Sequence, residues 1–325
     1  MSTPRFAAHA EAASSSLLDT VVEHLRRTPR QLPTHALYDA LGSALFDAIC
    51  CLPWYHITRT EQALLERHAA EIHALAGKPQ MLVEFGPGNG SKLETLLAPF
   101  GENPVRVELV DVSAEALTRA WSRLSLRPGA DVWLYRHGYE RSLARLAQRP
   151  HGRPTMLVFL GSNIGNFDTA SSAHLLRSMR AALRAGGTLL LGADLVKPDA
   201  ELLLAYDDPL GVTAAFNRNL LLNVNRETGA NFALDGFAHR AIWNADASRV
   251  EMHLVSLRRQ RVTLPAAEFE VAFAPGETLW TESSYKYEPA HLTAMLESAG
   301  FSVTAQWVAN GFALTLAAAA GEVPI

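Results

Sequence analysis

Short β-rich apolar segments alternate with helical segments through the middle of this 325-residue chain, and this alternation limits the possible folds more than any other feature. The segments at 81–85, 105–110, 132–135, 155–160 and 188–191 have the composition of strands. The fourth is almost wholly apolar, as a strand buried on both faces should be. A strand–helix–strand succession of this kind predicts an α/β fold with a doubly wound parallel sheet.

The region before this alternation has a helical pattern. Residues 17–50 are predicted to be helical because apolar residues recur on one face. A further helix is predicted to begin at Thr58, where Thr58-Arg59-Thr60-Glu61 fits a capping box. In such a box Thr58 accepts from first-turn amides while Glu61 reaches back to the start of the helix.

The region after this alternation is mixed. Residues 200–225 have a helical pattern, and 242–262 include strict alternation of apolar and polar residues, which predicts a strand with one buried face. A helix at 289–300 and two strands within 301–317 are then expected. We interpret the mixed part as a second, smaller domain, after which the chain returns to the first sheet.

Composition and charge argue against several classes of protein. The formal net charge of −4 comes without the basic stripe of a nucleic-acid binder. No stretch approaches the ~18 apolar residues of a membrane helix, and residues 1–16 do not resemble a signal peptide. The two cysteines, Cys50 and Cys51, are adjacent in an apolar run, which favours buried free thiols in a reducing cytoplasm. We expect a cytoplasmic monomer with no metal, nucleic-acid or membrane partner.

A glycine-rich turn, GPGNG at 86–90, follows the first predicted strand and opens a helix. Glycines there allow a sharp turn and close approach of a ligand beside the positive end of the helix dipole. The spacing excludes a P-loop, because Ser91 separates Gly90 from Lys92. A dinucleotide fingerprint would need its third glycine where Ser91 stands. The G-x-G-x-G spacing suits a methyltransferase, which binds no pyrophosphate.

Two later strand ends add candidates for cofactor contacts. Asp111 ends the second strand, where a doubly wound fold places a carboxylate against ribose hydroxyls. It can also be interpreted as a helix N-terminal residue near Ser113. Gly138 and Tyr139 follow the third strand, a position that usually faces the adenine. Tyr139 could stack on that base or could be a core tyrosine.

Several further segments resemble the histidine Nα-methyltransferases of ergothioneine biosynthesis. They cover most of the chain, and the part from Tyr206 to Asn217 is highly specific. The segments that carry the resemblance are Leu37-Tyr38-Asp39-Ala40 with Gly42-Ser43, Leu52-Pro53-Trp54-Tyr55 with the Thr58 to Glu61 segment, Gly161 to Asn166, Ala193 to Lys197, Tyr206-Asp207-Asp208 with Gly211 to Asn217, Arg249 to Met252 and Thr281 to Ser284.

The resemblance implies a Rossmann-type class I methyltransferase sheet with a second, smaller α+β domain and an amino acid bound between the two. It implies four regions: an N-terminal helical segment at 1–60, an S-adenosylmethionine-binding domain at 61–195, a substrate-binding domain at 196–285, and a return to the first domain at 286–325. The implied reaction converts L-histidine into Nα,Nα,Nα-trimethylhistidine (hercynine), with S-adenosylmethionine as methyl donor and S-adenosylhomocysteine as by-product.

The resemblance also implies roles for individual residues. The implied substrate contacts are Asn166 and Tyr206 for the carboxylate, Tyr55, Glu282 and Ser284 for the imidazole, and Phe46, Gly161 and Met252 as pocket residues. The implied cofactor contacts are Gly86, Gly88, Lys92, Asp111, Gly138 and Tyr139. Tyr38 would lie near both the sulfonium and the amine, and it is the candidate to orient the amine for in-line attack.

Without the resemblance, several of these residues are ambiguous. Asn166 would be a cap or turn residue, Tyr55 and Tyr206 half-buried tyrosines, Met252 core and Glu282 a solvent-facing strand residue. Their joint chemistry favours a site, because an imidazole N–H needs an acceptor and Glu282 can accept with charge assistance. That charge also favours an imidazole over an apolar side chain.

This chain departs from the family's pattern at three places. Gly138 stands where the family usually has an acidic residue, and the family's Gly-Ser-Gly-Thr loop is altered at 87–91. Tyr55-His56-Ile57 replaces the usual Tyr-Tyr-Pro. Alternative acceptors are therefore another free amino acid or a modified histidine. A non-catalytic relative that binds the cofactor or an amino acid is a third hypothesis.

Overall fold

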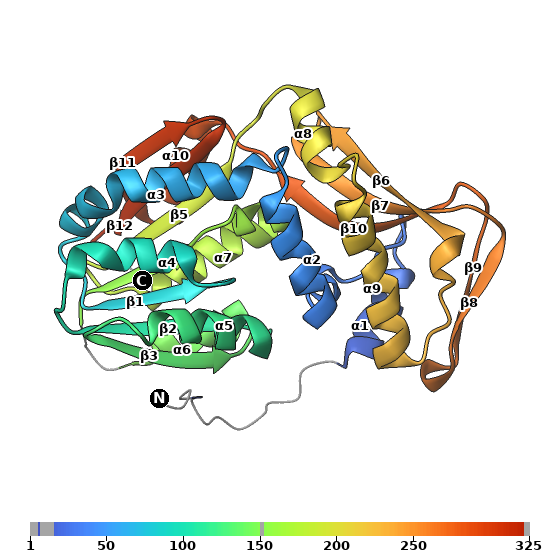
Figure 1. Ribbon diagram of the computed structural model, residues 1–325, viewed down its shortest axis with the longest axis horizontal. Coiled ribbons are helices and arrows are strands. Elements are labelled where there is room, and N and C mark those ends of the chain that lie inside the picture. Colours follow the sequence, from blue (N-terminus) through green and yellow to red (C-terminus); the bar gives the residue numbers. More distant parts are fainter. Residues whose placement is uncertain (1–5, 7–15, 150–152, 322–325) are drawn as a thin grey trace. The chain divides into compact units, whose positions relative to one another are not determined.

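The structure, a computed structural model, describes residues 6, 16–149 and 153–321. The chain divides into two compact units (Figure 1). Their described residues are 57–196, apart from 150–152, with 285–321 and residue 6 in the first unit, and 16–56 with 197–284 in the second. The chain thus leaves the first unit after Val196 and returns to it at Tyr285. Residues 16–56 belong to the same unit as residues 197–284.

A mostly parallel sheet forms the centre of the first unit. Its strands are β1 (Met81–Phe85), β2 (Val105–Asp111), β3 (Ala130–Arg136), β4 (Thr155–Phe159), β5 (Thr188–Asp194), β11 (Phe301–Ala309) and β12 (Phe312–Ala319). Their order is β11-β12-β5-β4-β1-β2-β3. The strands β1 to β5 pair in parallel, whereas β12 is antiparallel to β5 and β11. The predicted doubly wound parallel sheet is confirmed, with an antiparallel pair added at one edge.

Helices flank this sheet and bury its apolar side chains. They are α3 (His56–Leu75), α4 (Ser91–Leu97), α5 (Ala114–Leu124), α6 (Tyr139–Ala147), α7 (Thr169–Ala182) and α10 (Pro289–Ser298), with short 3-10 turns η2 (Ala98–Phe100) and η3 (Asn163–Asn166). Buried leucines of α6, α7 and α10 share one core with Val83 and Phe85 of β1. Each such side chain contributes about 1.5–3 kcal/mol when fully buried. Leu82 and Glu84 alternate with these residues and face the other side of the sheet.

Two predicted helix starts have opposite outcomes. The Ser113 cap of α5 is confirmed, because its hydroxyl accepts from Ala116 N at 3.2 Å. The prediction of a capping box at Thr58 is wrong. Helix α3 begins at His56, so Thr58 already lies within the helix. The Glu61 carboxylate instead accepts from Gly161 N and forms an ion pair with Lys92, because a charged ammonium is a stronger partner than a helix-end amide.

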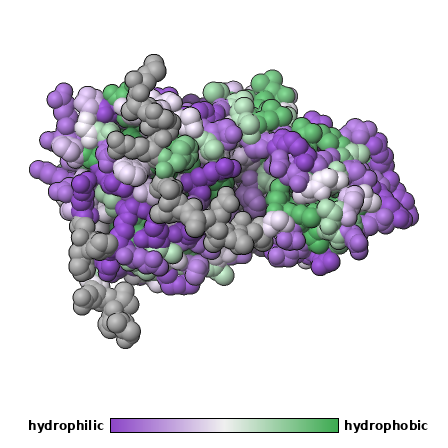
Figure 2. Space-filling model, turned by 90° about the horizontal axis from the view of Figure 1, so that it is seen from below, coloured by the Kyte–Doolittle hydropathy of each residue, from purple (hydrophilic) through white to green (hydrophobic). Residues whose placement is uncertain are grey.

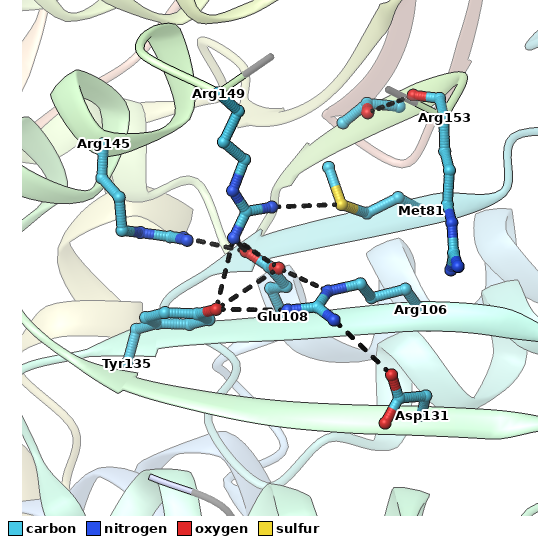
Figure 3. Close-up of polar contacts among 9 residues, drawn as sticks. Met81, Arg106, Glu108, Asp131, Tyr135, Arg145, Arg149 and Arg153 are labelled. Atoms are coloured by element: carbon cyan, nitrogen blue, oxygen red, sulfur yellow. Dashed lines mark hydrogen bonds and ion pairs between the residues drawn. The ribbon is translucent and has the colours of Figure 1, made fainter. Parts of the chain in front are cut away.

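A buried carboxylate joins α6 to the sheet (Figure 3). Glu108 of β2 is fully buried, and its Oε1 accepts from Arg106 Nε at 2.7 Å. Arg145 of α6 and Arg149 just beyond it donate to the same carboxylate, each at 2.8 Å. Burial opposes ionisation, but hydrogen bonds from the three arginines lower the pKa of Glu108 below its ordinary value. Breaking a buried pair costs about 3–5 kcal/mol, so this cluster fixes the position of α6 and of Tyr139 at its start.

The second unit combines helices with two small sheets. Its helices are α1 (Leu17–Leu25), α2 (Ala40–Cys51), α8 (Asp199–Tyr206) and α9 (Val212–Thr228), with 3-10 turns η1 (Thr34–Leu37), η4 (Leu234–Gly236) and η5 (Pro265–Ala267). Its strands are β6 (Phe237–Asn244), β7 (Arg249–Ser256), β8 (Gln260–Leu264), β9 (Phe269–Phe273) and β10 (Thr278–Tyr285), which extends one residue beyond the unit. Three of them form a sheet in the order β10-β7-β6, and β8 pairs with β9.

The N-terminal part of the second unit differs from its prediction in two respects. The helix expected across 17–50 is two helices, α1 and α2, because Pro29 and Pro33 interrupt it. Helix α2 then begins where the Asp39 carboxylate accepts from Gly42 N at 2.7 Å. The prediction that both cysteines are buried is also wrong, since Cys51 is exposed and Cys50 only half-buried.

Large apolar side chains on the surface are scattered. Leu126 in the first unit and Leu210 in the second are among the most exposed. On the face shown in Figure 2, hydrophilic side chains are interspersed with smaller hydrophobic groups. Within the described residues no single helix is long and apolar enough to cross a membrane, and α2 with α3 passes that test only as a pair bent by 71°.

Candidate functional site

The glycine-rich turn between β1 and α4 is built from backbone that glycine adopts most readily. Gly86, Gly88 and Gly90 have φ angles of +73°, +56° and +77°. A Cβ on Gly86 would lie 2.7 Å from Asn163 Nδ2 and 3.1 Å from Tyr139 Oη. No described atom lies within 4 Å of a Cβ placed on Gly88. The turn thus contacts protein at Gly86 and leaves open space beside Gly88.

The end of β2 adjoins this turn, because Gly86 N donates to Val110 O at 2.9 Å. Asp111 follows, and its Oδ1 accepts from Ser113 N at 2.8 Å. The interpretation of Asp111 as a helix N-terminal residue is therefore confirmed, and its contact with ribose stays a prediction for a residue that lies next to the glycine turn. Burial raises the pKa of the Asp111 carboxyl above its ordinary value.

Gly138 and Tyr139 begin helix α6. Gly138 is exposed, with open space around its Cβ position among the described residues. The Tyr139 ring makes edge contacts with Phe85 and Phe159, with centroids 5.7 and 5.5 Å apart. Burial also raises the pKa of the Tyr139 hydroxyl. Tyr139 therefore has the contacts of a core residue, while its hydroxyl approaches Gly86.

A second loop, at 161–166, lies beyond β4. Lys92 Nζ is 3.6 Å from the Cβ position of Gly161 at its start. Ser162 has a φ of +58°, which is uncommon for a residue with a side chain, and its Oγ accepts from Asp194 N at 2.9 Å. Asn166 is the last residue of η3 and is half-buried. Hydrogen bonding therefore holds this loop against β5.

The donor set around the two loops fits S-adenosylmethionine. The Lys92 ammonium matches the amino-acid carboxylate of that molecule, and Asp111 can accept from ribose hydroxyls.

Glu84 Oε2 is buried and has no hydrogen-bond partner among the described residues. Burial raises the pKa of Glu84 to about 8. We call the group formed by the turn at 86–92, Asp111, Gly138, Tyr139 and Gly161 the cofactor half-site.

Aromatic rings gather in the second unit. The Tyr38 ring contacts Phe46 and Phe216 edge-on, with centroids 5.7 and 5.5 Å apart. Phe46 contacts Tyr55 at 6.2 Å, and Tyr55 contacts Tyr206 at 6.3 Å. These residues come from the segment before α2, from α2, from the segment after it, and from α8 and α9. The structure therefore brings together residues that are far apart in the sequence.

Two polar pairs lie among these rings. Tyr38 Oη donates to Glu282 Oε1 at 3.4 Å, and Tyr206 Oη donates to Ser284 Oγ at 2.8 Å. Both Glu282 and Ser284 belong to β10 and are more than nine-tenths buried. A carboxylate can accept from more than one donor, and the rings around it offer apolar contacts. The arrangement therefore suits a ligand that brings an N–H donor attached to an apolar ring.

Buried asparagines of α9 hold the segment around Tyr38 in place. Asn219 Nδ2 donates to Asp39 Oδ1, and Asn223 Nδ2 donates to Ala36 O, both at 2.7 Å. These contacts lie on either side of Tyr38 along the chain. Because α9 also carries Phe216, one helix both positions Tyr38 and packs against its ring.

We call the second group the amino-acid half-site. Its members are Tyr38, Phe46, Tyr55, Tyr206, Phe216, Glu282 and Ser284. Met252 is fully buried in the neighbouring strand β7, and Thr281 Oγ1 donates to its carbonyl oxygen at 2.9 Å. Asn166 and Gly161, also implied as substrate contacts, belong to the first unit. Sequence reasoning assigned no site role to Phe216, although it lies in the segment that carries the most specific resemblance.

Comparisons with known proteins show the family to which the chain belongs. The model of the histidine-specific, S-adenosylmethionine-dependent methyltransferases matches residues 17–319. The chain is 41% identical over 313 residues to a histidine N-alpha-methyltransferase of Mycolicibacterium smegmatis, and 38% identical over 322 residues to one of Mycobacterium tuberculosis. Each alignment covers 95% of this chain and 96% of the relative.

A more distant relative is larger. Ergothioneine biosynthesis protein 1 of Schizosaccharomyces pombe is 28% identical over 305 residues, which cover 89% of this chain and 38% of that protein. The family model and the two bacterial relatives extend over both half-sites. This chain therefore belongs to the family of histidine-specific, S-adenosylmethionine-dependent methyltransferases.

Proposed function

We propose that this protein transfers methyl groups from S-adenosylmethionine to the α-amino group of L-histidine, giving hercynine after three rounds. The observation that carries the proposal is the buried Glu282 carboxylate, which Tyr38 contacts at 3.4 Å amid aromatic rings. An imidazole offers a flat apolar ring with an N–H donor, and Glu282 accepts that donor with charge assistance. By analogy with the named relatives, the product would serve ergothioneine biosynthesis.

The cofactor half-site supplies contacts for the methyl donor. When bound, S-adenosylmethionine supplies a methyl group bonded to a sulfonium, which an amine can attack. Lys92 would donate to its carboxylate and Asp111 would accept from its ribose hydroxyls. The open space at Gly88 and Gly138 would allow its ribose and base to approach the backbone closely.

The amino-acid half-site would select and orient the acceptor. Tyr206 would donate to the substrate carboxylate together with Asn166, while Tyr55, Glu282 and Ser284 would contact the ring. An α-ammonium has no lone pair, so it must lose a proton before it attacks. Tyr38 would orient the resulting amine, and the aromatic rings would exclude water from the reacting atoms.

The aromatic rings also favour repeated methylation. Each transfer to a neutral amine forms a cation, and ring faces attract cations by about 0.5–2 kcal/mol. Tyr38, Phe46 and Phe216 pack against one another, with centroids 5.7, 5.5 and 5.9 Å apart, so a methylated ammonium would contact this cluster from one side. The quaternary product has no lone pair, so transfer stops at three methyl groups.

A screen of acceptors tests the proposal. The protein is mixed with S-adenosylmethionine and each of the twenty amino acids, and products are identified by mass spectrometry. We expect gains of one, two and three methyl groups on histidine alone. Turnover of another amino acid or of a modified histidine instead would identify a different acceptor. Binding of S-adenosylhomocysteine and histidine without turnover would identify a non-catalytic relative.

Three further properties belong to the same proposal. We expect a monomer that acts in the cytoplasm on a small molecule, without a nucleic-acid partner. Light scattering measures the molecular mass in solution, and the monomer mass of 35.4 kDa is expected. A concentration-independent mass of twice that value would contradict the expectation.

A further inference from the structure

Glu61 is a buried carboxylate on α3 that joins three separate segments of the first unit. It is fully buried, and both of its oxygens accept from Gly161 N at 2.9 Å. Lys92 Nζ, from the start of α4, forms an ion pair with Oε2. The Lys92 side chain is 18% exposed, so this ion pair lies largely out of water. A single side chain thus holds a cation of the glycine turn and an amide of the loop at 161–166.

The sheet is shaped to admit this carboxylate. A Cβ on Gly192 of β5 would overlap Glu61 Oε1. Gly192 has no unusual backbone conformation, because its φ lies outside the left-handed region. The space that the missing side chain leaves is therefore occupied by Glu61. This is a reason for glycine in the middle of a strand, where glycine otherwise weakens the sheet.

Glu61 restricts two groups that would otherwise move. A lysine side chain has a flexible four-carbon stem. Fixing it in a binding site costs conformational entropy unless the side chain is already held in place before the ligand binds. An ammonium has three donors, of which Glu61 takes one. The Lys92–Glu61 pair has no net charge. Lys92 would therefore act on a bound carboxylate by directed hydrogen bonds rather than by long-range attraction.

We propose that Glu61 is a positioning residue of the cofactor site. It holds the Lys92 ammonium and the Gly161 amide in the arrangement that receives the amino-acid end of S-adenosylmethionine. The proposal rests on S-adenosylmethionine as the cofactor and not on histidine as the acceptor. Binding of S-adenosylhomocysteine therefore tests it even if the acceptor assignment is wrong.

Glu61→Gln tests the proposal by removing the charge at nearly constant shape. Gly161 N and Lys92 are both donors, and glutamine offers them one oxygen and one NH2 group, which cannot accept. We expect calorimetry to show affinity for S-adenosylhomocysteine about tenfold lower than in the wild type. Glu66→Gln, which changes an exposed carboxylate on the same helix, is the control and should bind normally.

The direction of the change in affinity for S-adenosylhomocysteine separates the two ways in which Lys92 could act. If Lys92 acted by long-range attraction, removal of the neighbouring negative charge would tighten binding. Unchanged or tighter binding by a folded Glu61→Gln variant would overturn the proposal. Circular dichroism and thermal unfolding without ligand establish that the variant is folded.

Two other variants test the same point without removing the charge. Gly192→Ala pushes the Glu61 carboxylate from its place, and Glu61→Asp shortens its reach by one methylene. Both should weaken S-adenosylhomocysteine binding, and normal binding by both would overturn the proposal. In steady-state kinetics the KM for S-adenosylmethionine should rise by a larger factor than the KM for histidine, a split that general destabilisation would not produce.

A double-mutant cycle tests whether Glu61 acts through Lys92. Lys92→Met should weaken S-adenosylhomocysteine binding by itself. In that background, Glu61→Gln should have a clearly smaller effect than in the wild type, because the positioned group is gone. Fully additive effects would contradict action through Lys92.

Discussion

The two half-sites are built from different parts of the chain. In the cofactor half-site, left-handed glycines and the ends of strands provide most of the shape, and few side chains carry charge. In the amino-acid half-site, aromatic rings provide the shape. The polarity comes from two side chains of β10, Glu282 and Ser284, each of which accepts a hydrogen bond from a tyrosine. The first group lies on a parallel sheet, and the second is assembled from helices and one strand of a small sheet.

This difference has a physical cause and a consequence. The donor carries the same sulfonium and nucleoside whatever the acceptor, so a backbone-built site suffices for it. Selecting one amino acid requires a distinctive pattern of side chains, because neighbouring acceptors differ only in their side chains. Substitutions in the cofactor half-site should therefore alter binding of the donor for every acceptor, while those in the amino-acid half-site should alter acceptor choice.

Glu282→Ala is expected to have the largest effect. Loss of a charge-assisted hydrogen bond in a buried site should lower kcat/KM for histidine about 100-fold. Affinity for S-adenosylhomocysteine should stay within about twofold, as calorimetry would show. Glu227→Ala removes a half-exposed carboxylate of the same unit and is the control. Unaltered histidine turnover in Glu282→Ala would mean that the imidazole assignment is wrong.

Gly86→Ala is expected to disturb the other half-site. Its Cβ would approach Asn163 and Tyr139, and its backbone would be strained as well. We expect affinity for S-adenosylhomocysteine to fall about 20-fold, given roughly 1–2 kcal/mol of strain plus the displaced side chains.

Gly77→Ala is the matched control for Gly86→Ala. Gly77 has nearly the same φ, +72°, but no described atom lies within 4 Å of its Cβ position. Its substitution should lower thermal stability without changing the dissociation constant. Equal losses of affinity in the two variants would show that backbone strain alone explains the effect of Gly86→Ala.

Asn166→Ala should have an intermediate effect. It tests a residue that belongs to the same unit as the cofactor half-site but is expected to contact the amino-acid substrate. Asn166 belongs to the first unit but is expected to hold the substrate carboxylate. Loss of a hydrogen bond to a charged group should raise the KM for histidine about tenfold. An effect confined to the KM for S-adenosylmethionine would contradict the carboxylate role and assign Asn166 to the cofactor half-site.

Glu84 provides the smallest expected effect, on stability as a function of pH. Burial raises its pKa from 4.5 to about 8 in the folded protein. Between these values the unfolded chain has lost a proton that the folded protein keeps, so the free energy of unfolding falls as pH rises. From pH 6.5 to 7.5 this contribution should fall by about 1 kcal/mol.

Urea unfolding of the wild type and of Glu84→Gln at these two pH values measures the contribution of Glu84. The glutamine variant should lack this part of the pH dependence, because glutamine does not titrate. A wild type and a variant with the same pH dependence would show that Glu84 does not keep its proton in the folded protein.

The sequence predicts the cofactor half-site better than the amino-acid half-site. Strand–helix alternation and the glycine spacing indicate the parallel sheet, the turn at 86–90 and Asp111 at the end of β2, because these depend on local pattern. The convergence of Tyr38, Tyr206 and Glu282 depends on contacts across up to 244 residues of chain. Local periodicity carries no signal for such contacts, so only the family resemblance indicated them.

Predictions from local pattern fail at some other positions because the contacts there are also distant in sequence. The segment around Glu61 fits a helix cap locally, but its carboxylate binds groups 31 and 100 residues away. Helix α6, which starts at Tyr139, was not predicted, although the Glu108 cluster fixes it to the sheet. Glu61 does lie in one of the segments that carry the resemblance, and that was the available signal.

The position of the transferred methyl group tests the central claim most directly. The protein is given histidine and S-adenosylmethionine labelled with ¹³C in the methyl group, and the product is examined by NMR. Long-range correlations from the labelled methyl groups to the α-carbon of histidine are predicted, with three equivalent methyl groups at completion. Correlations to carbons of the imidazole ring would contradict methylation of the α-nitrogen.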